Sequence, residues 1–249
     1  MITLQHTTAP AVPDQAGWVA AQVLLLGVLG GTVGLAPAGW LVGVCHGLTT
    51  WFLLAAAMLR AGVRSPGPAD RVTLARGVLV GGVAALVADR AGEDVPVALL
   101  VALASAALAL DFVDGLVARR TGTASPLGAR FDMEVDAFLI LVLSAHVALD
   151  LGPWVLAIGV MRYAFVAVSW VAPWLRGELP PSFARKAVAA GQGVLLVVAA
   201  SGLVPFAGVL VGSALAALVW SFGRDVVGLW RNRGRVAVEA VVVKECSRV

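Results

Sequence analysis

The chain of 249 residues contains 60% hydrophobic and 13% charged residues and carries a formal net charge of +3. Its mean hydropathy of +0.92 and its low charged fraction, against roughly 25% in soluble domains, exclude an ordinary soluble globular protein. We therefore expect an all-α polytopic membrane protein. About 20 apolar residues in a helix cross a bilayer, so this length accommodates about eight spans.

Two apolar segments, residues 18–35 and 40–59, follow a short polar N-terminus at residues 1–17. That terminus lacks the basic region and the cleavage site of a signal peptide, so we expect the first segment to stay in the mature protein. The two segments predict an N-terminal transmembrane hairpin. Overlapping G-x-x-x-G pairs within residues 27–34 favour close helix packing in lipid and are compatible with a homodimer.

Six further apolar segments follow a linker whose Pro, Gly and Ser residues break the helix. We expect these helices at residues 71–88, 97–117, 131–149, 154–170, 183–200 and 205–222. A basic tail, residues 223–249, comes last, and it either lies along anionic lipid or is flexible.

The placement of positive residues predicts the topology. All but two of the 18 Lys and Arg residues lie in the tail, in loops on one face of this arrangement, or in the first turns of the helices that begin at that face. The exceptions are Arg90 in an opposite loop and Arg162 inside a helix. By the positive-inside rule, that face and both termini are cytoplasmic in a multi-pass plasma-membrane protein. Because topology accounts for the basic residues, no nucleic-acid partner is expected.

Four carboxylates interrupt two consecutive apolar segments. Asp111 and Asp114 share one helix face, and Asp132 and Asp136 share a face of the next helix. Asp111 lies roughly 13 Å and Asp136 roughly 9 Å from the linked ends of their helices, so all four can reach one depth. Carboxylates in a bilayer are costly unless they line a polar cavity or meet a cation. We therefore expect the chemistry of the protein here.

The donor atoms of this group favour a hard divalent cation. The site offers oxygen ligands without thiolate or imidazole, so Mg²⁺ or Mn²⁺ fits best, and we expect two ions. Paired divalent ions suit phosphoryl-type transfer, because they neutralise a phosphate and orient the attacking and leaving oxygens. Gly115 and Gly128 permit close approach to the acids, and Arg119 supplies a forked donor for phosphate.

Two alternatives stay open at this point. In the first, the acids only form salt bridges with Arg119, Arg120 and Arg130 at a solvated helix end. In the second, the protein is a divalent-cation or proton-coupled transporter, which would predict polar or broken segments through the full bilayer depth.

Residues 111–136 contain the pattern D-x2-D-G-x2-A-R-x8-G-x3-D-x3-D. At every fixed position this stretch resembles the signature of the CDP-alcohol phosphatidyltransferases. Upstream, Asp70, Thr73 and Arg76 resemble the N-x2-T-x2-R of the first core helix of that family, with Asp70 in place of the usual Asn. The resemblance covers about residues 68–222 as a six-helix core, and the N-terminal hairpin lies outside it.

The resemblance implies transfer of a phosphatidyl group from CDP-diacylglycerol to a small alcohol, with release of CMP, in phospholipid biosynthesis. It also implies that the four acids hold two metal ions and that Asp136 acts as general base on the acceptor hydroxyl. Further residues would contact the cytidine diphosphate. They are Thr73, Asp114, Gly115, Ala118, Arg119 and Gly128.

The acceptor alcohol stays unresolved among inositol phosphate, glycerol phosphate and serine. Candidate acceptor-binding residues are Arg130, Arg162, Arg185 and Lys186. Arg162 lies in mid-span, where a cation is expected to face the bundle interior rather than to snorkel. Arg185 and Lys186 either bind a phosphorylated acceptor or serve only the topology.

Overall fold

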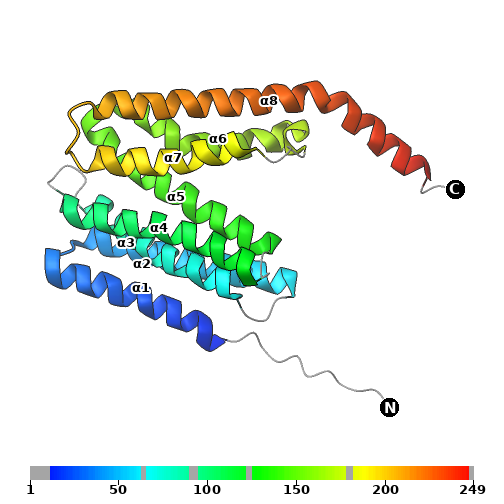
Figure 1. Cartoon of the computed structure of the whole chain (residues 1–249). Helices are drawn as coiled ribbons and strands as arrows, with labels where there is room; N and C mark the ends of the chain where they lie inside the picture. Colours follow the sequence, from blue (N-terminus) through cyan, green and yellow to red (C-terminus); the bar gives the residue numbers. More distant parts are fainter. Residues whose placement is uncertain (1–11, 63–65, 90–94, 122–124, 178–181, 247–249) are drawn as a thin grey trace, which may run out of the picture. The chain divides into compact units, whose positions relative to one another are not determined.

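The computed structural model describes residues 12–62, 66–89, 95–121, 125–177 and 182–246. Regular structure in these ranges consists of α-helices and two short 3-10 helices, without a strand (Figure 1). The elements are α1 (Val12–Val33), α2 (Pro37–Ala61), α3 (Pro68–Asp89), α4 (Val97–Thr121), α5 (Pro126–Leu151), η1 (Pro153–Val155), α6 (Leu156–Val171), η2 (Pro173–Arg176), α7 (Phe183–Ala200) and α8 (Ala207–Cys246). The predicted all-α class is confirmed.

Six helices in the described ranges are long and apolar enough to cross a membrane. They are α2, α3, α4, the η1–α6 segment, α7 and the first part of α8. The apolar stretch of α1, Gly17–Val33, is shorter, and acidic residues interrupt the sequence of α5. Each of the eight predicted segments is thus a helix, and six of them meet the length and hydropathy expected of a span. The polytopic helical bundle is confirmed.

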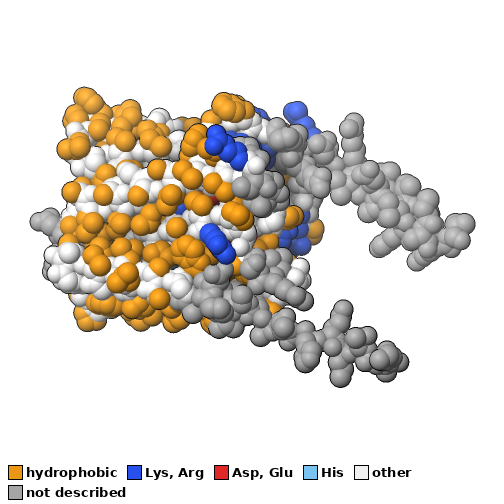
Figure 2. Space-filling model, turned by 60° about the horizontal axis from the view of Figure 1, so that its bottom comes forward, with side chains coloured by type: hydrophobic (Ala, Val, Ile, Leu, Met, Phe, Trp, Pro, Cys, Tyr) orange, Lys and Arg blue, Asp and Glu red, His pale blue; other side chains and the backbone are white. Residues whose placement is uncertain are grey.

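Large hydrophobic side chains are exposed on these helices. Leu24 of α1, Phe52 of α2 and Val209 of α8 are 70%, 64% and 71% exposed. Hydrophobic side chains are also widespread on the face seen in Figure 2. An apolar surface of this extent is unusual in a soluble monomer, and a lipid bilayer is the environment that accommodates it.

Local sequence determines where α3 and α5 begin. α3 and α5 each start at a proline, whose fixed φ suits a first helical turn. The Asp70 carboxylate accepts the backbone N–H of Gly67 at 2.9 Å, which is half of a capping box. The Ser125 hydroxyl accepts the backbone N–H of Gly128 at 2.9 Å, which is an N-cap contact.

The chain forms two compact units, residues 1–142 and 143–249, whose boundary falls within α5. In the first unit α3 is central, because α1, α2 and α4 all pack against it, and α1 also packs on α2. A hydrophobic cluster of Leu54, Met58 and Leu74, with Phe131 packed on it, joins α2 and α3 to the start of α5. This cluster fixes the first turns of α5 within the first unit.

In the second unit α7 packs along α8, and α6 contacts α8 and η2. The predicted end of the last helix near residue 222 was wrong, because α8 continues to Cys246. The apolar pattern weakens after that point, but residues 223–246 contain no proline. A helix that is already nucleated propagates until a breaking residue or a competing contact stops it.

Candidate active site

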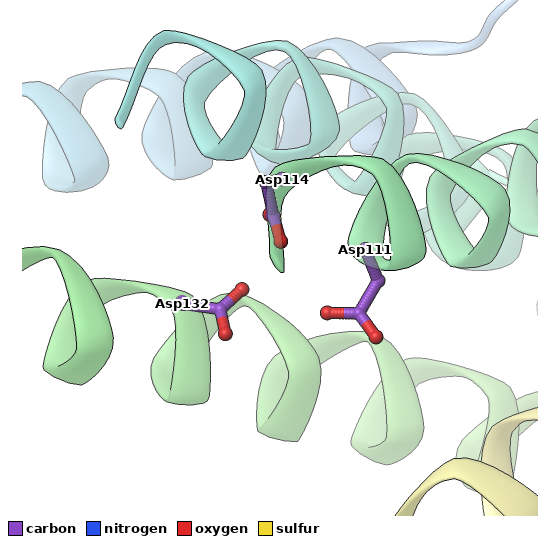
Figure 3. A group of neighbouring side chains, drawn as sticks. All are labelled: Asp111, Asp114 and Asp132. Atoms are coloured by element: carbon purple, nitrogen blue, oxygen red, sulfur yellow. The ribbon is translucent and has the colours of Figure 1, made fainter. Parts of the chain in front are cut away.

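Three carboxylates from two helices converge in the first unit. Asp111 and Asp114 project from α4 toward Asp132 of α5 (Figure 3). One oxygen from each of the three lies within 4.8 Å of the others, a spacing at which they can hold a metal ion. The helical spacing of the sequence explains this arrangement, since positions i and i+3 share a face of α4.

A single arginine of α3 lies among all four acids. The Arg76 side chain is 1% exposed, and its Nη1 lies 3.0 Å from Asp111 Oδ1 and 2.7 Å from Asp114 Oδ2. The same Nη1 also pairs with Asp132, and Nη2 pairs with Asp136. The four acids thus share one guanidinium. We call Arg76 and these four acids the acidic site.

Arginines at the end of α4 and the start of α5 (Arg119, Arg120 and Arg130) were the salt-bridge partners considered from the sequence, and Arg76 was not among them. Arg120 and Arg130 have exposed side chains. A signal for Arg76 was nevertheless present, because it follows Thr73 by three residues in a stretch, residues 72–88, that is otherwise apolar. Polar residues at this spacing inside a span face the protein interior rather than lipid.

Thr73 completes the polar face of α3. Its hydroxyl lies 3.3 Å from Asp114 Oδ2 and 3.3 Å from the backbone oxygen of Ala69, and it can donate to either. Asp114 is the most enclosed of the acids, with 5% of the residue exposed, whereas the other three are half-buried. Thr73, expected to contact cytidine diphosphate, therefore lies directly against a predicted metal ligand.

Gly128 lies where the start of α5 meets the start of α3. A Cβ added at Gly128 would collide with the Asp70 carboxylate and lie 3.1 Å from Ser125 Oγ. A larger residue would separate the two helix starts, so the close approach requires glycine. Asp70 itself caps α3 through Gly67, which gives this acid a structural function.

Other predicted site residues are described less fully. Gly115 is half-buried on α4 beside Asp114. Ala118 and Arg119 lie on the same helix, but their side chains are outside the described residues.

Three predicted acceptor residues belong to the second unit. Arg162 is half-buried on α6, and Lys186 is exposed in the first turn of α7. Arg185 pairs with Asp225 of α8 at 3.6 Å, a contact that the sequence did not suggest. Their described positions are therefore within that unit, whereas Arg130 and the acidic site belong to the first.

The residues of the acidic site fit a divalent cation. Their metal-binding atoms are carboxylate oxygens, which Mg²⁺ and Mn²⁺ prefer. The four acids and Arg76 together have a formal net charge of −3, and most of these groups are withdrawn from solvent. A bound cation reduces the repulsion between these neighbouring carboxylates.

Residues 68–222 match the family of CDP-alcohol phosphatidyltransferases. The match covers more than half of the chain, from the start of α3 into α8, and it includes the whole acidic site. The chain belongs to this family. Comparison with curated proteins gives no match, and neither does comparison with solved structures.

Membership of the CDP-alcohol phosphatidyltransferases confirms the resemblance seen in the sequence. It identifies the chain as a membrane transferase of the class that moves a phosphatidyl group from a CDP-alcohol. The family uses divalent metals, and the carboxylates of Asp111, Asp114 and Asp132 can hold one.

Proposed function

We propose that this CDP-alcohol phosphatidyltransferase uses CDP-diacylglycerol as donor and a small alcohol as acceptor, releasing CMP in phospholipid biosynthesis. The observation that carries the proposal is the convergence of Asp111, Asp114 and Asp132 in an otherwise apolar bundle. Arg76 offsets one of the four negative charges, and the divalent ions of a metal-dependent reaction on a diphosphate would offset the rest.

The four acids of the acidic site would hold two ions, Mg²⁺ or Mn²⁺. Bound there, such ions neutralise phosphate charge and orient the attacking and leaving oxygens. The contribution of the chain is to keep the carboxylates of α4 and α5 on one polar face. The packing of α5 on the Leu54, Met58 and Leu74 cluster supports this arrangement.

Asp136 would serve as general base. It lies one turn beyond Asp132 on α5, and a carboxylate within hydrogen-bond reach of a hydroxyl can accept its proton. The acceptor oxygen then bonds to the phosphorus of the phosphatidyl group. The bond from that phosphorus to the CMP oxygen breaks, and CMP leaves with the electron pair.

Residues on α3, α4 and α5 would contact the cytidine diphosphate. They are Thr73, Asp114, Gly115, Ala118, Arg119 and Gly128. Two contacts between described residues support this assignment, namely the Thr73 hydroxyl against Asp114 and the close approach of Gly128 to Asp70. The absence of a side chain at Gly115 leaves room for a ligand beside the acids.

The acceptor would be inositol phosphate, glycerol phosphate or serine. Arg130, Arg162, Arg185 and Lys186 are the candidate acceptor residues, and their charge favours the two phosphorylated alcohols. The distribution of Lys and Arg along the sequence supports a reaction on the cytoplasmic face of the membrane.

The test is CMP release by the purified protein in lipid nanodiscs. CDP-diacylglycerol is supplied with Mg²⁺ or Mn²⁺, and the three alcohols are added one at a time. We expect release with one of them and its loss in EDTA. Asp136→Asn should lower the rate about a hundredfold or more. Glu134→Gln, which removes an exposed acid of the same helix, is the matched control and should leave the rate unchanged.

The proposed reaction fails if none of the alcohols releases CMP. The proposed base fails if Asp136→Asn releases CMP as fast as the unchanged protein.

A further inference from the structure

Among the Lys and Arg residues whose side chains the structure describes, Arg76 alone is buried. It extends from α3 to acids on both α4 and α5 and so touches every member of the predicted metal-binding quartet. A buried cation in a membrane protein is costly unless it is paired, and four carboxylates provide that pairing.

The guanidinium lies where a metal ion would lie. Asp111, Asp114 and Asp132 are the three acids whose oxygens gather closely enough for a metal, and Nη1 of Arg76 contacts all three. Mg²⁺ requires oxygen ligands at about 2.0–2.1 Å. An ion held by these three oxygens would overlap Nη1, so the two cations exclude each other.

Among the described residues, the four acids make the polar contacts of the guanidinium. Nη1 and Nη2 are both engaged with carboxylates, whereas Nε is buried and has no hydrogen-bond partner among the described residues. The stem of an arginine side chain has several rotatable bonds. A cation that neutralises the acids therefore also removes the attraction that keeps Arg76 among them.

We propose that Arg76 is an internal counter-ion, which holds the acidic site together without metal and is displaced when divalent ions bind. The inference rests on the proposed two-ion function of the same acids. The observed metal affinity then reflects a competition between the Arg76 guanidinium and the ion. Each binding event must first break the contacts of Nη1 with three carboxylates. Arg76 is thus a positioning residue that sets the metal requirement of the site.

Mn²⁺ binding tests this competition without any substrate. The loss of the free Mn²⁺ signal in electron paramagnetic resonance measures the affinity of protein in nanodiscs. Arg76→Gln removes the competing cation, and we expect Mn²⁺ to bind about tenfold more tightly. Arg60→Gln, which removes an exposed positive charge from α2 of the same unit, is the control and should bind Mn²⁺ as the unchanged protein does.

Arg76→Lys separates displacement from a simple effect of charge. It keeps the positive charge but loses the planar fork that reaches four acids at once. Displacement predicts a Mn²⁺ affinity between those of the unchanged protein and Arg76→Gln. An affinity of Arg76→Lys equal to that of the unchanged protein would overturn displacement and leave only a long-range charge effect.

Thermal unfolding provides a second readout. Without Arg76 the four acids repel each other in EDTA, so the Tm of Arg76→Gln should fall in EDTA and recover in Mg²⁺. The Mg²⁺-dependent rise in Tm should therefore be larger than in the unchanged protein. Folding of the variant in Mg²⁺ but not in EDTA would also support the proposal. If Arg76→Gln folds under neither condition, the Mn²⁺ affinity of Arg76→Lys distinguishes displacement from a long-range charge effect.

The inference and the proposed reaction can fail separately. Mn²⁺ binding that is equal or weaker in Arg76→Gln overturns displacement and leaves the reaction standing. Absence of CMP release with every alcohol, while Mn²⁺ binding tightens in Arg76→Gln, overturns the reaction but not the displacement. Absence of Mn²⁺ binding in every form overturns the metal site and the inference together.

Discussion

Two neighbouring helices of the first unit, α2 and α3, are both apolar enough to span a membrane yet have opposite surroundings. In α3, 61% of the most apolar stretch is buried, against 17% in α2. α3 packs against three other helices, whereas α2 exposes Leu48, Phe52 and Leu53. The difference shows that hydropathy identifies a span but not what surrounds it, because lipid tails are as apolar as a protein interior.

What distinguishes α3 in the sequence is small and polar residues. Its buried face contains Gly77, Gly81 and Gly82 together with Thr73 and Arg76. Without a hydrophobic driving force between helices in lipid, association depends on close backbone approach and on polar contacts. Such residues mark the helix that the others surround, and the following substitutions test this difference between the two helices.

The largest effect on stability is expected at Gly81 of α3. A Cβ added there would lie 2.6 Å from Gln22 Oε1 and from His46 Cδ2, and Gln22 is itself buried. We expect Gly81→Leu to lower the free energy of unfolding by about 3 kcal/mol, measured as a drop in Tm in detergent. Gly31→Leu on α1, where no atom lies within 4 Å of the added Cβ, is the control. Equal Tm values for the two variants would contradict the central position of α3.

A matched pair of leucines tests the same comparison directly. Leu86 of α3 is fully buried, whereas Leu53 of α2 is 59% exposed. Leu86→Ala leaves a cavity and should cost about 2 kcal/mol of unfolding free energy. Leu53→Ala exchanges a lipid contact and should change it by less than about 0.5 kcal/mol. Thermal unfolding of both variants measures the difference, and a larger loss at Leu53 would reverse the assignment of the two helices.

His46 lies on the side of α2 that faces the protein. Its Nε2 donates to the backbone oxygen of Gly77 at 3.0 Å, and its ring stacks on Phe138 of α5 with centroids 4.9 Å apart. His46→Phe keeps a ring for stacking and loses the hydrogen bond, so we expect a loss of about 1 kcal/mol. His46→Leu loses both contacts and should unfold at a lower temperature still. Cys45→Ala, an exposed neighbour, controls for substitution on this helix, and unchanged Tm values for both His46 variants would show that these contacts do not stabilise the fold.

The sequence predicted the features that follow from local pattern. Apolar runs predicted each α-helix of the described ranges, and the spacing of Asp111, Asp114 and Asp132 placed them on facing sides of α4 and α5. The pairing of Arg76 could not be predicted in this way. Arg119, Arg120 and Arg130 are nearer to the acids along the chain, and the choice of Arg76 depends on α3 being the central helix, which is a property of packing.

Two further features depend on backbone contacts that composition does not show. The capping of α3 by Asp70 requires the Gly67 N–H to lie within reach of its carboxylate, and the fixed glycine of the signature, Gly128, lies against that same carboxylate. The extension of α8 to Cys246 reflects helix propagation, which continues beyond the apolar pattern. A pattern of hydropathy therefore locates a span better than it locates the end of a helix.

An effect no larger than that of His46→Phe is expected at Thr73, on the polar face of α3. Its hydroxyl lies 3.3 Å from Asp114 Oδ2, but Arg76 remains to pair with the same carboxylate. Thr73→Val keeps the shape of the side chain and removes a neutral donor, a loss of about 1 kcal/mol. If Thr73 also contacts the donor substrate, the KM for CDP-diacylglycerol should rise about fivefold with kcat little changed. Thr49→Val, on an exposed position of α2, should change neither constant. A fall in kcat at unchanged KM would instead assign the Thr73 hydroxyl to the transition state, and the polar face of α3 would then belong to the chemistry rather than to binding.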